Sequence, residues 1–293
     1  MVRPATSDQP TRRWRLVIAY DGSDFHGFAA QPGVRTVAGT LGEALARTAR
    51  LQGPPPLTCA GRTDTGVHAE GQVVHVDLPA ALRLSRRGGL ERPMEGPDLQ
   101  VALNRQLAPE IVVRAAEAVA PGFDARRSAI SRTYRYLVWN APLPNPLLTA
   151  VSWHVPDPLD LRAMRSASDA IIGIHDFRAF CRRPPGATPD QPLVRRVHRA
   201  QWERCWDARA GTETLGELLA FEIEADSFCH QMVRSLVAAV VEAGRGRANA
   251  AVVLSWLRSG TRQGLPKPAP ACGLCLVSVS YGDLLGPLAR VRY

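Results

Sequence analysis

Residues 61–68 read GRTDTGVH and are followed at residues 72–78 by QVVHVDL. The first stretch places two glycines around one carboxylate, that of Asp64, and glycine permits backbone conformations that are closed to other residues. The second stretch is rich in β-branched residues and predicts a strand. A loop at the start of a strand is a frequent position for a catalytic group. Asp64 is therefore the first candidate for a catalytic residue.

Two interpretations of Asp64 remain open from this octapeptide alone. Arg62 lies two residues earlier, and in an extended segment the two side chains share one side, where the cation holds the carboxylate ionised. An aspartate between threonines and next to glycine is also a common turn element, in which the side chain bonds to nearby backbone amides.

The composition indicates a globular protein with an anionic partner. The chain has 293 residues, of which 45% are hydrophobic, so it is large enough for one or two domains with ample core. The formal net charge is +9. An excess of positive charge favours a polyanion, and nucleic acid first among these.

The sequence predicts neither a membrane span nor a metal site. It holds no run of about 20 apolar residues, and residues 1–13 are polar and proline-containing, which predicts a disordered tail. The six cysteines are scattered along the chain, which fits a reduced, cytoplasmic protein. Cys272 and Cys275 have the spacing of a zinc half-site, but no second pair accompanies them.

The spacing of apolar residues predicts both strands and helices. Thr36 is the expected N-cap of a helix that buries Val37, Leu41, Leu45 and Ala49. Strands are expected at residues 14–20, 72–78, 111–119, 131–139, 195–205, 218–225 and 271–281, and the strands 195–205 and 218–225 are expected to pair. Further helices are expected at 99–107 with Asp98 as cap, 159–172, 230–243 and 250–257 with Asn249 as cap.

Both halves of the chain combine strands and helices in a comparable order. This predicts an α+β protein of two similar lobes of mainly antiparallel sheet flanked by helices, with a central RNA-binding cleft. The proline-rich residues 140–158 are the expected hinge. Residues 14–145 then form an N-terminal catalytic lobe that carries the Asp64 loop, and residues 146–293 form a C-terminal lobe that completes the active-site cleft.

Two basic segments each allow two interpretations. Alternation over residues 131–139 places Arg132, Tyr134 and Tyr136 on one face of a strand. That face suits an RNA surface, with guanidinium groups for phosphate and rings for stacking, or equally a half-buried strand with solvated arginines. Residues 79–97 are rich in Pro, Gly and Arg, and their basic insert at 83–92 is either a disordered surface loop or an arm that touches RNA.

Five separated motifs carry a family resemblance. They are residues 20–23 with 25 and 27; residues 61–67; residues 123–129 with 132–136; residues 228, 230 and 232–234; and residues 269–270 with 273–274. In this order and over nearly the whole chain, they resemble the tRNA pseudouridine synthase A family.

The resemblance implies an isomerase that converts uridine to pseudouridine at positions 38, 39 and/or 40 of the tRNA anticodon stem-loop. It implies a homodimer without metal or organic cofactor. By the match of motifs, Asp64 is the nucleophile and Tyr134 packs on the target base and is a candidate for handling the C5 proton. Arg234 pairs with Asp64 and helps hold the flipped nucleotide open, and Arg62 contacts the RNA backbone.

The chemistry fits these residue types. The reaction exchanges a C–N bond for a C–C bond without oxidation or reduction, so it needs no electron carrier. An ionised carboxylate attacks the sugar C1′ or removes a sugar proton to give a glycal, and the sequence does not choose between these routes. A flipped base calls for an aromatic partner and a cation near the gap.

Several positions depart from the family pattern, and two other functions compete with it. Phe28 and Ala29 stand where Trp and Gln are usual, Thr65 where Ala is usual, and Cys229 where Leu is common. One alternative is a non-catalytic RNA-binding protein of the same fold, which would not need Asp64 with its arginines. The other is a glycosidic hydrolase with two carboxylates, for which Glu70 and Asp77 are the nearest second acids in sequence.

Overall fold

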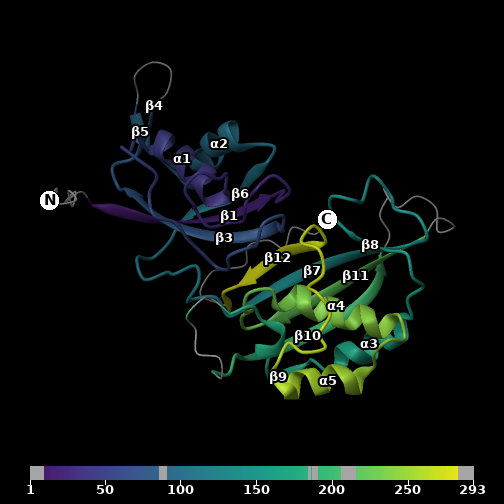
Figure 1. Cartoon of the computed structure of the whole chain (residues 1–293). Coiled ribbons are helices and arrows are strands. Elements are labelled where there is room, and N and C mark those ends of the chain that lie inside the picture. The colour runs from purple at the N-terminus through teal and green to yellow at the C-terminus, as the bar shows by residue number, and fades with distance from the viewer. Residues whose placement is uncertain (1–9, 86–90, 184–185, 187–190, 206–215, 283–293) are drawn as a thin grey trace. The chain divides into compact units, whose positions relative to one another are not determined.

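The computed structural model of the chain describes residues 10–85, 91–183, 186, 191–205 and 216–282 (Figure 1). The chain forms two compact units, one of residues up to 63 and 69–129, the other of residues 64–68 and from 130 onward. Both combine strands with helices, which confirms the α+β class. The residues around Asp64 are grouped with the second unit, although the strand that follows them lies mostly in the first.

The first unit is built on a sheet in the order β6-β1-β3. The strands are β1 (Thr11–Tyr20), β3 (His68–Pro79) and β6 (Ile111–Ala118), and the short β2 (Thr58–Cys59) pairs with β3. All pairs are antiparallel. Leu16 and Ile18 alternate along β1 and are fully buried. Helices α1 (Val37–Ala49) and α2 (Gly96–Leu107) lie together on one side of this sheet (Figure 1).

The helix starts of this unit test the predicted caps. Thr36 accepts a hydrogen bond from the Gly39 N–H and caps α1, as predicted. The prediction of Asp98 as N-cap of α2 is wrong, because the helix begins at Gly96 after Glu95. The Asp98 carboxylate instead accepts a hydrogen bond from the Glu95 N–H within a capping box. Pro97 fits the first helical turn, where its missing N–H costs nothing.

The basic insert contains a small hairpin. Strands β4 (Arg83–Ser85) and β5 (Glu91–Pro93) pair antiparallel. Arg92 forms two hydrogen bonds of 2.7 Å to the Asp98 carboxylate, which fix the hairpin to the start of α2. Arg86 and Arg87, which the RNA-arm hypothesis included, lie outside the described residues.

The second unit has a sheet in the order β12-β7-β11-β10-β9. The strands are β7 (Ser131–Asn140), β9 (Gly173–Asp176), β10 (Val194–Cys205), β11 (Glu217–Ala225) and β12 (Leu274–Ser280). These pairs are antiparallel, and the short β8 (Trp153–Val155) adds to β7 in parallel. The predicted pairing of the strands near 195–205 and 218–225 is confirmed.

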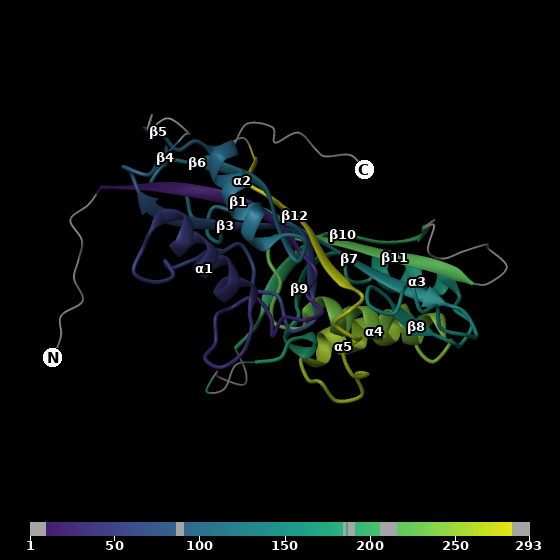
Figure 2. The same cartoon turned by 90° about the horizontal axis from the view of Figure 1, so that it is seen from above.

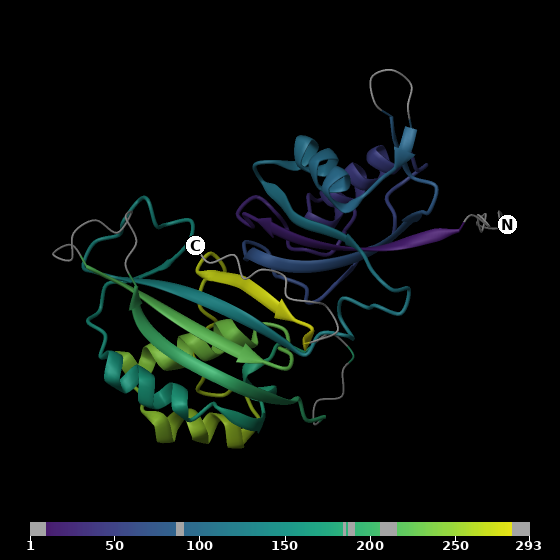
Figure 3. The same cartoon turned by 180° about the vertical axis from the view of Figure 1, so that it is seen from behind.

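Three helices lie on one side of this second sheet (Figures 2 and 3). They are α3 (Leu161–Asp169), α4 (Met232–Gly244) and α5 (Ala250–Ser259), and a 3₁₀ turn, η1 (Arg178–Phe180), precedes β10. Leu236, Val237 and Val240 of α4 are fully buried, so this helix forms the centre of the core. Asn249 caps α5 through the Val252 N–H, as predicted.

Two predicted boundaries differ from the structure. Strand β1 starts at Thr11, so residues 11–13 are not part of a disordered tail, and Arg13 bonds to Asp77 on β3; residues 1–9 lie outside the described part. The division between units falls at 129/130 and not at 145/146. The reason is that β7, placed before the expected hinge, pairs with both β11 and β12 of the second unit.

Gly96→Ala is expected to lower the free energy of unfolding by about 1–3 kcal/mol. A Cβ at this position would overlap the backbone carbonyl oxygen of Ala116 in β6, and backbone does not move aside as a flexible side chain does. Gly122→Ala is the matched control, because nothing lies within 4 Å of the added atom. Urea unfolding of both variants measures the difference, and equal stability would contradict the packing of α2 on β6.

Candidate active site

Asp64 lies on a short turn that is fixed at both ends. The Val67 N–H donates to the Asp64 carbonyl at 3.2 Å, and Gly66 closes the turn at φ 76°, a conformation that favours glycine. Before the turn, Thr63 is buried; its hydroxyl lies 2.8 Å from the Tyr20 hydroxyl, and its carbonyl accepts from the Phe28 N–H. The backbone around the carboxylate is thus held in one conformation.

A buried glutamine on β3 supports the same loop. Gln72 is fully buried, and its amide donates to the Gly61 carbonyl at 2.6 Å. A buried hydrogen bond of this kind is costly to remove, because it would leave a carbonyl without a partner. Strand β3, which follows Asp64 in the chain, therefore fixes Gly61 at the start of the Asp64 loop.

The Asp64 carboxylate is paired through both of its oxygens. Arg234 Nη1 lies 3.2 Å from Oδ2, and His230 Nε2 lies 3.3 Å from Oδ1. The Asp64 side chain is 27% exposed, so the group is held yet accessible. The structure brings together Asp64 and Arg234, residues that are 170 positions apart.

Arg234 is fixed by a second segment of the chain. Its Nε donates to the Ala269 carbonyl at 2.7 Å, and its backbone carbonyl accepts from the Ala269 N–H at 3.0 Å. The neighbouring Pro270 carbonyl accepts from the buried Tyr136 hydroxyl at 2.7 Å, and burial raises the pKa of Tyr136 far above its ordinary value. One guanidinium group therefore joins the carboxylate to a rigid part of the second unit.

Tyr134 lies within β7 and is almost fully buried. Its ring packs edge-on against Phe228, with centroids 5.1 Å apart and planes at 87°. Phe228 stands two residues before His230, so one short segment contacts both Tyr134 and Asp64. The face of β7 that carries Arg132, Tyr134 and Tyr136 is buried, and Arg132 donates to the Asp226 carbonyl, so this face is not an open surface for RNA. Contact of Tyr134 with a flipped base stays a prediction.

The local sequence predicts that Arg62 pairs with the Asp64 carboxylate, but in the structure Arg62 is exposed. The groups that pair with the Asp64 carboxylate are Arg234 and His230 instead. The two-residue spacing can place two side chains on one side of an extended segment, but it does not tell whether a cation from a distant part of the chain lies closer to the carboxylate.

His230 is the site residue that the sequence analysis gave no role. The available signal was its spacing of four residues from Arg234, which places two side chains on one side of a helix start. That signal is weak here, because His230 lies outside the helix. The predicted helix start at 230 is wrong: Gln231 has φ 64°, and α4 begins at Met232.

Asp77, a possible second acid for a hydrolase, is engaged elsewhere. Arg13 forms bonds of 2.8 and 2.7 Å to its two oxygens. This hydrogen bonding lowers the pKa of Asp77 below its ordinary value. A carboxyl group that stays ionised in this way is a poor general acid.

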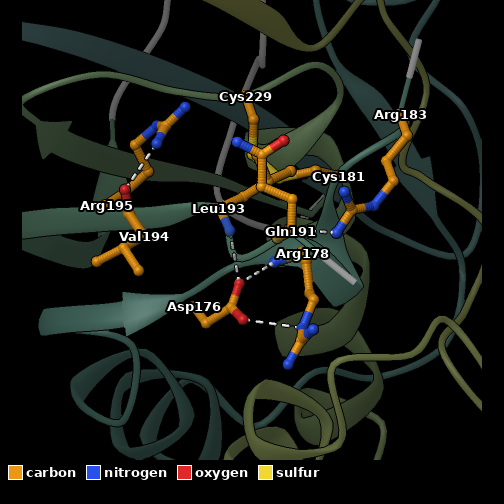
Figure 4. The surroundings of a disulfide bond; sticks show 9 residues. All are labelled: Asp176, Arg178, Cys181, Arg183, Gln191, Leu193, Val194, Arg195 and Cys229. Carbon is orange, nitrogen blue, oxygen red and sulfur yellow. Dashed lines mark hydrogen bonds and ion pairs between the residues drawn. A yellow bond between two sulfur atoms is a disulfide. The ribbon is translucent and has the colours of Figure 1, made fainter. Parts of the chain in front are cut away.

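The cysteines differ from the expectation of six free thiols. The structure joins Cys181 and Cys229 in a disulfide, with Cα atoms 5.7 Å apart (Figure 4), whereas Cys59, Cys205, Cys272 and Cys275 are free. Cys229 immediately precedes His230, so this bond attaches the site segment to the residues after η1. Burial raises the pKa of the Cys272 thiol.

The described residues contain no group of three or more His, Cys, Asp or Glu side chains placed to hold a metal ion. Within the same residues, no helix is both long enough and apolar enough to cross a bilayer. An accessible carboxylate paired with Arg234 and His230 is suited to nucleophilic or proton-removing chemistry.

Comparison with known proteins identifies the family. A family model described as tRNA pseudouridine synthase matches residues 167–282. Three relatives are named tRNA pseudouridine synthase A. The protein of Leifsonia xyli is 44% identical to this chain, and the match covers 94% of this chain and 93% of that protein. The proteins of Frankia casuarinae and Mycobacterium leprae are 44% and 40% identical, with 92% and 96% of this chain and 89% and 93% of those proteins covered. The chain belongs to the tRNA pseudouridine synthase A family.

Proposed function

We propose that this chain isomerises uridine to pseudouridine at positions 38, 39 and/or 40 of the tRNA anticodon stem-loop, with Asp64 as the nucleophile. The observation that carries the proposal is a partly exposed carboxylate on a fixed turn, paired with Arg234 and His230. Family membership supports the isomerase activity and the tRNA substrate. The net charge of +9 suits an RNA partner.

The reaction asks little of the protein beyond an ionised carboxylate. The bond between uracil N1 and ribose C1′ breaks, the base turns, and a bond between C5 and C1′ forms. The carboxylate attacks C1′ or removes a sugar proton to give a glycal. The C5 proton leaves and N1 gains one, so no electrons are exchanged and we propose that no cofactor takes part.

We assign the remaining roles by residue. Arg234 pairs with Asp64 and holds the flipped nucleotide open. Tyr134 packs on the target base and is the candidate for handling the C5 proton, and the exposed Arg62 contacts the RNA backbone. These roles follow from the match of motifs, and the contacts at Asp64 support that of Arg234.

The assembly is also proposed from the family resemblance. We propose a cytoplasmic homodimer that binds the tRNA anticodon stem-loop. The organisation into an N-terminal catalytic lobe and a C-terminal lobe that completes the site, with a central RNA-binding cleft, stays a prediction.

The test uses three anticodon stem-loop RNAs that each carry a single uridine, at position 38, 39 or 40. After incubation with the protein, the RNA is digested and its nucleosides are separated. We expect pseudouridine from at least one RNA, with no change in RNA mass. Release of free uracil would instead indicate the hydrolase, and binding without product would indicate the RNA-binding protein.

A further inference from the structure

The segment from Phe228 to Gln231, between β11 and α4, contacts a different group with each successive residue. Phe228 packs against Tyr134, Cys229 is bonded to Cys181, and His230 faces Asp64. Gln231 then turns the chain into α4 through a left-handed conformation at φ 64°. A non-glycine residue in this conformation is uncommon. The backbone thus reaches His230 along a fixed path.

The backbone of His230 is held from outside its own segment. The Arg182 N–H donates to the His230 carbonyl at 2.9 Å, directly beside the bond between Cys181 and Cys229. Figure 4 shows both cysteines next to the ordered residues around Asp176, whose carboxylate accepts from the Leu193 and Arg178 N–H groups. The His230 side chain is 45% exposed, but its backbone is attached to the protein on both sides, unlike that of a mobile surface histidine.

We propose that His230 is a positioning residue for Asp64 in the reaction proposed above. Arg234 Nη1 donates to Oδ2 at 3.2 Å, and His230 Nε2 lies 3.3 Å from Oδ1, so one contact to each oxygen fixes the plane of the carboxylate. A carboxylate has about four lone-pair sites, and two remain for the ribose. Fixed orientation of a nucleophile raises the rate of its attack without changing how tightly the RNA is bound.

The test compares three substitutions of His230 that differ in the position of the remaining side-chain N–H donor. The Gln amide nitrogen takes the place of Nε2, the Asn amide nitrogen takes the place of Nδ1, and Ala has no donor. We expect His230→Ala and His230→Asn to lower the single-turnover rate by about 10- to 100-fold, the loss that corresponds to one hydrogen bond to a charged group. His230→Gln should stay within about threefold of the wild type.

The control and the binding measurement separate positioning from other roles. His198→Ala removes another exposed histidine of the same unit, one that pairs with Asp226, and should leave the rate unchanged. The Kd for the anticodon stem-loop RNA should be the same in all variants. Equal rates for Ala and wild type, an equal loss in Gln and Ala, or a loss confined to Kd would overturn the proposal.

A second measurement does not depend on activity, so it distinguishes failure of the positioning role of His230 from failure of the proposed synthase function. In long-range ¹H–¹⁵N spectra of the histidine rings, Asp64→Asn should move the His230 signals, which His230→Gln identifies by their absence. Asp77→Asn, whose partner is Arg13, should leave them in place. Unmoved His230 signals would refute the contact itself, whereas a wild type that forms no pseudouridine would refute the proposed function.

Discussion

Asp64→Asn is expected to lower the rate of pseudouridine formation by about 10⁴-fold or more, the size of effect seen when an enzyme loses its nucleophile. The amide has nearly the same shape as the carboxylate but neither attacks C1′ nor removes a sugar proton. The amide keeps one oxygen, so one of Arg234 and His230 retains an acceptor. The turn itself is held by the backbone bond from Val67 to residue 64, so the fold and RNA binding should be retained. Single-turnover nucleoside analysis and filter binding measure the two properties separately.

Asp77→Asn is the control for this substitution. Asp77 lies on β3, 13 positions after Asp64 in the sequence, and pairs with Arg13. We expect its rate to stay within about threefold of the wild type, because exposed ion pairs contribute little. A rate for Asp64→Asn as high as that of Asp77→Asn would remove Asp64 from the reaction.

Arg234→Lys is expected to lower the same rate by about 10²-fold or more, comparable to losing one preorganised donor in an active site. The guanidinium group contacts Asp64 through Nη1 and the Ala269 carbonyl through Nε. A lysine ammonium is a single point of charge and does not reproduce this planar pair of contacts. The positive charge alone should therefore not restore the activity.

Arg258→Lys tests whether any arginine of the second unit behaves in this way. Arg258 is exposed in the last turn of α5, and its replacement should leave the rate unchanged. A full rate in Arg234→Lys would mean that charge suffices at this position. Full activity in Arg234→Ala as well would contradict any role of Arg234 at the site.

Local signals were enough to predict much of the fold. The cap at Thr36 and the apolar spacing of Val37, Leu41 and Leu45 define α1 without help from the rest of the chain. The strands near 195–205 and 218–225 were predicted as a pair, and they are one. Errors occurred at element ends, as at Asp98 and Gln231, where the true start depends on single backbone conformations.

The sequence could not predict which face of strand β7 is buried. Alternation places Arg132, Tyr134 and Tyr136 on one face, but it does not tell whether other elements cover that face. In the structure this face is buried. The Asp226 carbonyl provides a partner for the Arg132 guanidinium, which makes burial of a charged side chain acceptable.

The site could be predicted only in part for a similar reason. Asp64 stands out locally because two glycines surround it, whereas its partners come from residues more than 160 positions later. Spacing along the chain cannot supply such contacts, and the family resemblance pointed to Arg234 but gave no role to His230. The locally predicted partner, Arg62, is exposed instead.

The most direct measurement is tritium release from anticodon stem-loop RNA labelled at uracil C5, with wild type and a folded Asp64→Ala protein. Formation of the C5–C1′ bond requires the C5 hydrogen to leave. Release by the wild type and none by Asp64→Ala is the predicted result. Equal release by both proteins would contradict Asp64 as the nucleophile, and no release by the wild type while it still binds the RNA would contradict the synthase activity.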